Sequence, residues 1–206
     1  MSGVNETLVR EYFELHNFYV RQHRKYISSN VRTEEEADFY IINPRTPDTK
    51  SDLPFVLGSE HLRKLSSALV VVKGWHTETF GPAMLSTTPE MFRFAESSAL
   101  KEATSVYGGS APATLMVIPV LPANPELKEE SIRLLREKGI SGVILFRTIL
   151  GDLIQNIEIN RNYQKSDVLQ LIRILKTYDF LKEQQMELFK PVKKRKKTSV
   201  KPVQAG

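Results

Sequence analysis

The chain of 206 residues contains no cysteine, only four histidines and a single tryptophan. Without cysteine there can be no disulfide bond and no thiolate zinc site, and no two histidines have the spacing of a metal-binding pair. Glycine patterns of phosphate-binding or dinucleotide loops are missing, and no serine lies in a nucleophile elbow. The chain also lacks an apolar run of about 18 residues and the regions of a signal peptide. We therefore expect a cytoplasmic protein with no membrane partner.

The charge is concentrated at one end of the chain. The net charge is +5, but residues 190–201 carry seven basic side chains and no acidic one, so the remainder has a net charge of −2. This composition predicts a folded domain over 1–189 and a basic, disordered tail over 190–206. The tail can attract phosphates independently of sequence. Its candidate nucleic-acid-binding residues are Lys193, Lys194, Arg195, Lys196 and Lys197.

Hydrophobic patterns predict an α/β protein with a single domain. Apolar runs favour strands at 18–27, 37–42, 67–76, 114–120 and 142–147. Capping signals favour helices at 7–16 after Asn5, at 88–106 after Thr88, at 125–138 after Asn124 and at 167–189 after Ser166. Residues 58–65 predict a short helix or turn, and 149–159 fit either a helix or a strand. The alternation of strands and helices in the second half predicts a mixed central sheet flanked by helices.

One lysine stands out because it ends the most apolar strand. Residues 67–72 are Ser-Ala-Leu-Val-Val-Val, and Lys73 follows them directly. A buried lysine requires an anionic partner, unless its aliphatic stem carries the ammonium to water. This part of the chain therefore predicts either a carboxylate, metal or phosphate site, or a lysine that reaches solvent at the end of the strand.

Three residues in the first half of the chain follow a known order. Glu11 lies in the first predicted helix, Asp38 opens an apolar strand after two glutamates, and Lys73 ends the next long strand. In this order the chain resembles the PD-(D/E)XK nuclease superfamily, which has the restriction-endonuclease-like fold. The resemblance implies a mixed central sheet, a catalytic role for Glu11, Asp38 and Lys73, and Mg²⁺ as the cofactor of a DNA-cleaving phosphodiesterase.

The chain departs from this family at Val71, where the family carries an acid two residues before its lysine. Side chains alternate along a strand, so Val71 and Lys73 point to the same face and the site loses one oxygen ligand. Because Mg²⁺ requires oxygen donors, this loss weakens metal binding. Glu36 and Glu78 are the candidates for a relocated acid, and with Asp38 they form the expected set of metal ligands.

Three functions remain open at this stage. The first is a nucleic-acid-binding protein with a degenerate catalytic centre, whose partner is DNA. The second is an active Mg²⁺-dependent deoxyribonuclease with a relocated acid, and the third is a non-catalytic protein-interaction module that uses the last helix. The resemblance also implies a homodimer. Trp75 and His76 can frame a nucleotide or simply pack, and the basic patch that can bind phosphates or protect a strand edge is Arg21, Arg24 and Lys25.

Overall fold

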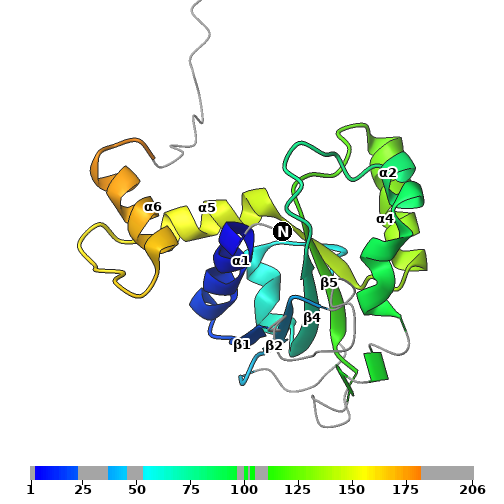
Figure 1. Cartoon of the computed structure of the whole chain (residues 1–206), viewed down its shortest axis with the longest axis horizontal. Coiled ribbons are helices and arrows are strands. Elements are labelled where there is room, and N and C mark those ends of the chain that lie inside the picture. The colour runs from blue at the N-terminus through cyan, green and yellow to red at the C-terminus, as the bar shows by residue number, and fades with distance from the viewer. Residues whose placement is uncertain are drawn as a thin grey trace, which may run out of the picture.

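The fold is a single mixed β-sheet with helices on both faces (Figure 1). We describe a computed structural model, in which residues 3–22, 37–45, 53–96, 100–101, 103–104 and 111–181 are described. The predicted α/β class is therefore confirmed. Of the candidate site residues, Glu36, Arg24, Lys25 and those of the basic tail lie outside the described residues.

The six described strands are ordered β1-β2-β4-β5-β6-β3 in the sheet. The strands β1, β2 and β4 pair in an antiparallel manner, while β4, β5, β6 and β3 are parallel. Their bounds are β1 (Tyr19–Gln22), β2 (Phe39–Ile42), β3 (Val56–Leu57), β4 (Ser67–Val72), β5 (Ala113–Ile118) and β6 (Gly142–Leu145).

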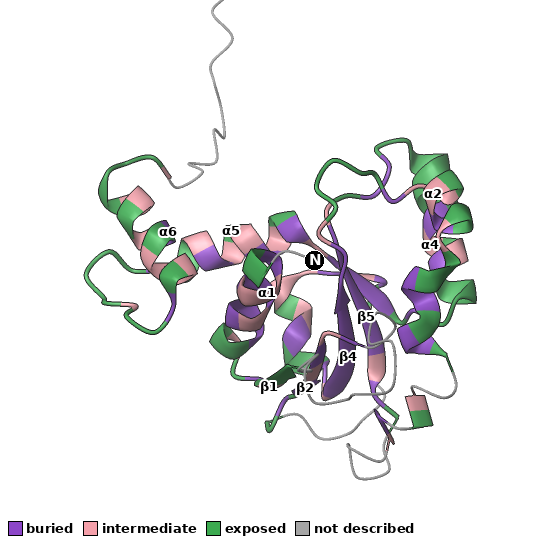
Figure 2. Ribbon diagram, in the orientation of Figure 1, coloured by how far each residue is buried: buried purple, intermediate pink, exposed green. Residues whose placement is uncertain are grey.

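The helices divide the sheet into two faces, each with its own apolar core. One face carries α1 (Gly3–Leu15), the 3₁₀ helix η2 (Ser59–Lys64), α5 (Phe146–Asn156) and α6 (Asp167–Thr177). The other face carries α2 (Pro82–Thr87), the 3₁₀ helix η3 (Pro89–Ala95) and α4 (Pro125–Glu137). Figure 2 shows that β4 is buried between these layers and that α6, at one end, is mostly of intermediate burial. Within the described residues, no helix is long and apolar enough to cross a membrane.

Most of the predicted elements are present, with shorter bounds. Asn124 and Ser166 cap α4 and α6 with their side chains, as expected. Asn17 ends α1 in the left-handed region, with φ of 66°. The ambiguous segment 149–159 is mostly helical, within α5. The last predicted helix ends early, because the chain reverses at Asp179, whose φ is 59°.

Two predictions are wrong. Asn5 does not cap the first helix: α1 begins at Gly3, and Asn5 is a buried residue inside it. The helix predicted at 88–106 is not one continuous helix: it begins at Pro89 as a 3₁₀ helix that ends at Ala95, and the described residues 100–101 and 103–104 are helical again. Thr88 does not cap it with its side chain, because the Thr88 hydroxyl donates to the carbonyl of Met84 in the preceding helix. The sequence patterns also missed β3 and α2.

Candidate functional site

The start of β2 lies beside the end of β4, as the sequence predicts for Asp38 and Lys73. In the antiparallel register Phe39 faces Val70, so Asp38 comes next to the last residues of β4. Asp38 Oδ2 accepts a hydrogen bond from the backbone N–H of Val72, with an N···O distance of 2.6 Å. This hydrogen bond holds the end of β4 in place, and it occupies one of the two carboxylate oxygens of Asp38.

Lys73 extends the ladder by one residue beyond β4. Its backbone N–H donates to Val117 O in the parallel neighbour β5, at 2.9 Å. The side chain is buried, and its Nζ lies 5.9 Å from the centroid of the Trp75 ring. Burial beside an aromatic face gives the ammonium a partial replacement for its hydration.

Val71 occupies the position at which the family carries an acid. It is 2% exposed and belongs to the same apolar cluster as Leu69 and Phe80. The alternation of the strand directs Val71 and Lys73 to this face of the sheet. Val71 therefore contributes an apolar side chain to this face of the sheet, where an acid would have contributed an oxygen ligand.

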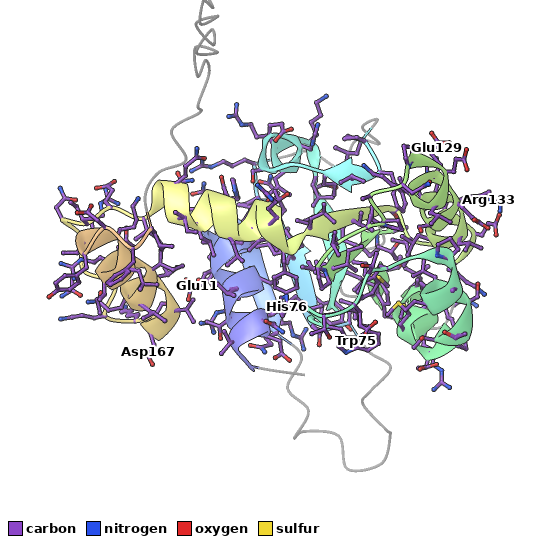
Figure 3. All side chains as sticks on the ribbon, turned by 90° about the horizontal axis from the view of Figure 1, so that it is seen from above. Glu11, Trp75, His76, Glu129, Arg133 and Asp167 are labelled. Carbon is purple, nitrogen blue, oxygen red and sulfur yellow. The ribbon has the colours of Figure 1, made fainter. Side chains whose placement is uncertain are left out.

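Glu11 lies apart from Asp38 and Lys73. The apolar residues of α1 belong to the core on the opposite face of the sheet, and Glu11 is turned about 120° around the helix from Asn5. In Figure 3 Glu11 lies on the side of α1 that faces α6, whereas His76 and Trp75 lie on its other side. Glu11 Oε1 instead accepts from Arg10 Nη2 at 3.2 Å. The structure does not bring the first-helix Glu into the candidate site.

The described residues do not form a Mg²⁺ site. No three side chains of His, Asp or Glu gather closely enough to hold a metal among the residues that the structure describes. Glu78 is exposed in the loop after β4, where its backbone N–H donates to Trp75 O at 2.9 Å. Magnesium requires several oxygen ligands in near-octahedral geometry, and two-metal hydrolysis requires bridging carboxylates. The described donors do not fit that requirement.

The loop after β4 is held by Asn5, which the sequence pattern predicts to be a helix cap. Asn5 Nδ2 donates to Gly74 O at 3.4 Å, and Asn5 Oδ1 is 3.0 Å from His76 Nε2. Because the amide oxygen only accepts, His76 Nε2 is the donor of this hydrogen bond. The His76 ring also packs edge-to-face on Phe146, the first residue of α5, with centroids 4.7 Å apart. The loop is thus joined to the starts of α1 and α5.

Gly74 is required by this arrangement. A Cβ atom at position 74 would lie 1.8 Å from Asn5 Nδ2, far inside van der Waals contact. The periodicity of helices and strands does not predict a contact between residues 69 positions apart. The glycine in the Lys-Gly-Trp-His segment was the one sign in the sequence that another group approaches the backbone there.

Of the expected basic patch, only Arg21 can be placed. It is exposed on β1, the edge strand of the sheet, opposite Tyr40 of β2. Arg24, Lys25 and the five tail residues 193–197 lie outside the described residues. Arg21, the described member of the patch, is separated from β4 by β2.

Comparison of the chain with protein-family models, with curated proteins and with solved structures gave no match.

Proposed function

We propose that this protein binds nucleic acid at the end of β4 and does not hydrolyse it, on a fold related to the restriction-endonuclease-like nucleases. The support for this relation is the order of a first helix, a strand that begins with Asp38, and a neighbouring strand that ends with Lys73. The observation that carries the proposal is the contact of Asp38 with the backbone of Val72, beside the buried Val71. Lys73 and Asp38 stand where the resemblance expects them, and Asp38 uses one carboxylate oxygen to hold the end of β4.

Loss of hydrolysis follows from the missing oxygen ligands. Asp38 uses one oxygen for the backbone, Val71 contributes none, and Glu11 lies on the opposite face of the sheet. Among the residues that the structure describes, no group of carboxylates gathers to hold Mg²⁺ where it would activate water and stabilise the leaving oxygen. What this end of the sheet retains is a cation, Lys73, beside an aromatic ring.

Binding to nucleic acid is supported by charge and by aromatic surface. Lys73 and the half-exposed Trp75 lie together at the end of β4. The sequence adds a basic tail at 190–201, which can contact phosphates without base specificity. A cation beside an aromatic ring and a separate run of basic residues are typical of proteins that bind single-stranded nucleic acid.

The proposal is tested by assaying cleavage and binding on the same preparation. Labelled plasmid and single-stranded DNA are incubated with the wild-type protein in Mg²⁺ or Mn²⁺, and binding is measured by gel shift at low salt. We expect binding without cleavage, weaker binding by Lys73→Ala, and unchanged binding by the control Lys128→Ala on the exposed side of α4. Removal of residues 190–206 should reduce the salt dependence of binding.

Cleavage by the wild-type protein that is lost in Asp38→Ala and Lys73→Ala would contradict the proposal. That result would establish the deoxyribonuclease with a relocated acid, and Glu36→Gln and Glu78→Gln would then identify the acid. Failure to bind any nucleic acid would also overturn the proposal.

A protein-interaction module is the second candidate, and the surface of α6 supports it. This helix and its flanking residues expose large apolar side chains: Ile159, Leu171, Ile174, Tyr178 and Phe180. An apolar stripe with polar surroundings is typical of a surface that contacts another protein. A chain that binds no nucleic acid and associates with itself, in a manner abolished by Leu171→Glu, would favour this function.

A further inference from the structure

The outer face of α6 carries an apolar stripe with one polar group at each end. The stripe consists of the exposed residues Asp167, Leu171, Ile174 and Tyr178. At 3.6 residues per turn, their spacing places the four side chains within about 60° of the helix circumference. Tyr178 still belongs to the stripe, because its N–H donates to Ile174 O at 3.1 Å. The leucine and the isoleucine therefore lie between a carboxylate and a phenol.

The basic side chains of α6 are held by the domain itself. Lys176 Nζ donates to two backbone carbonyls at the end of α5, at 2.7 Å each, and Arg173 Nε donates to Ile159 O at 2.8 Å. Within α6, from its first residue to its last, Asp167 is the only charged residue that is exposed. A surface with a carboxylate and no cation disfavours phosphates and anionic membranes as partners.

The stripe is complementary to itself when two copies lie antiparallel. A two-fold axis between Leu171 and Ile174 places the leucine of each copy on the isoleucine of the other. The same axis places Asp167 opposite Tyr178, because both pairs are centred on the same point of α6. A tyrosine hydroxyl donates to a carboxylate, so each end of the contact gains a charge-assisted hydrogen bond. A parallel arrangement would instead bring the two carboxylates together, which is unfavourable.

From this self-complementarity we infer that the chain forms a two-fold symmetric dimer through antiparallel packing of α6. The helix lies at one end of the molecule, away from α2 and α4 (Figure 1), and Figure 3 shows Asp167 at its outer edge. The inference rests on the second candidate function, for which it names the partner, and it does not depend on nucleic-acid binding.

The size of the contact sets the expected strength of the dimer. Phe180 is 75% exposed directly after α6 and adds apolar surface at the end of the stripe. The helix itself is about 16 Å long, so the contact falls at the lower end of stable interfaces, about 1,200 Å² of buried surface. We therefore expect a dimer that dissociates at concentrations on the order of 1–100 μM.

Association is measured on the full-length protein by sedimentation velocity over a range of concentrations. We expect an equilibrium between monomer and dimer that Leu171→Glu weakens about 10-fold or more, because it places a carboxylate in the apolar centre of the contact. The matched control is Leu127→Glu on α4, since Leu127 is also an exposed helical leucine, at 46% against 55% for Leu171. This control should associate as the wild type does. Circular dichroism verifies that both variants are folded.

The chain has no cysteine, so introduced thiols report the orientation of the two helices without interference. Asp167→Cys and Tyr178→Cys are mixed and oxidised with oxidised glutathione. In the antiparallel dimer these two positions lie opposite each other, whereas two copies of one position are about 16 Å apart, beyond the reach of a disulfide. We expect a cross-linked dimer from the mixture and little from either variant alone. Glu129→Cys on α4, mixed with Tyr178→Cys, is the control and should not cross-link.

Three results would overturn the inference. A monomer at every concentration would exclude self-association, whatever the gel shift shows about nucleic acid. The thiol of Leu171→Cys then separates the remaining cases: free reaction with a labelling reagent leaves the stripe open to a different protein, and protection shows that the chain itself covers it. Dimerisation that Leu171→Glu leaves unchanged would place the interface elsewhere. Cross-linking of each cysteine variant with itself, and not in the mixture, would reject the antiparallel arrangement.

Discussion

Asp38 Oδ2 and the backbone nitrogen of Val72 are 2.6 Å apart. This hydrogen bond joins Asp38, which directly precedes β2, to the last residue of β4, the neighbouring strand. A charge-assisted hydrogen bond of this kind stabilises the fold, whatever else the carboxylate does. The stability of Asp38 variants is therefore as informative as their activity.

We predict that Asp38→Ala lowers the free energy of unfolding by about 1.5–3 kcal/mol, because the Val72 N–H loses its acceptor. Asp38→Asn retains an acceptor oxygen of nearly the same geometry and should cost less. Urea unfolding of the wild type and both variants measures the difference. Equal stability of all three would show that this hydrogen bond makes no net contribution to folding.

Gly74→Ala should destabilise the protein, because its new Cβ overlaps with the Asn5 amide. We expect a loss of about 1–3 kcal/mol, the usual range for overpacking. Asn5→Ala alone loses the hydrogen bonds to Gly74 O and to His76. The double variant should be less destabilised than the sum of the two, since removal of the amide relieves most of the overlap. Strict additivity in the double-mutant cycle would contradict this packing.

Glu78 is predicted to oppose nucleic-acid binding rather than to hold a metal. It is exposed three residues after Trp75, so its neutralisation in Glu78→Gln should raise affinity about two- to fivefold at low ionic strength. Glu129→Gln on α4, far from Trp75 in Figure 3, is the matched control and should leave affinity unchanged. Loss of a Mg²⁺-dependent cleavage in Glu78→Gln would instead assign this carboxylate to a metal.

Tyr12 should make the protein less stable at alkaline pH. Burial raises the pKa of the Tyr12 hydroxyl from 10.0 to about 12, against the opposing effect of its hydrogen bond with Ser59. A raised pKa means that the folded state holds the proton more tightly, so this contribution is complete below pH 10 and is lost as the pH rises towards 12. Two pKa units correspond to about 3 kcal/mol.

This pH dependence is measured by urea unfolding between neutral and strongly alkaline pH. Tyr12→Phe cannot titrate at this position and should show a smaller loss of stability across that range. The exposed Tyr19→Phe serves as the control and should follow the wild type. Identical pH profiles for Tyr12→Phe and the wild type would refute the prediction.

The sequence predicted the parts of the fold that are encoded by local patterns. Six residues of uninterrupted burial in β4 leave a clear signal in the chain, and the side-chain caps Asn124 and Ser166 mark their helices directly. The two-residue strand β3 and the short helix α2 are too brief for any hydrophobic period to be visible. The helix α5 was ambiguous because it follows β6 without any intervening loop residue.

The sequence predicted part of the candidate site, namely that Asp38 and Lys73 lie close together in space. Asp38 directly precedes β2 and Lys73 directly follows β4, its antiparallel neighbour, and only the resemblance in sequence order implied that the two residues lie close together. The position of Glu11 depends on which face of the sheet α1 covers, and that is decided by packing of the whole chain. Asn5 was misassigned for a similar reason, since an asparagine near a helix start signals a cap in the absence of tertiary contacts.

The position of β3 has a consequence for the order in which the chain can fold. This strand precedes β4 in the sequence, yet its hydrogen-bonded neighbour is β6, the last of the described strands to leave the ribosome. Both ends of the sheet therefore belong to the first third of the chain, while β4, β5 and β6, which lie between β2 and β3, are synthesised later. Pairings of such long sequence separation form slowly. In a nascent chain that stops before β6, one edge of β5 is unpaired and β3 has no partner. We therefore expect the domain to become resistant to protease only after residue 145 has been synthesised.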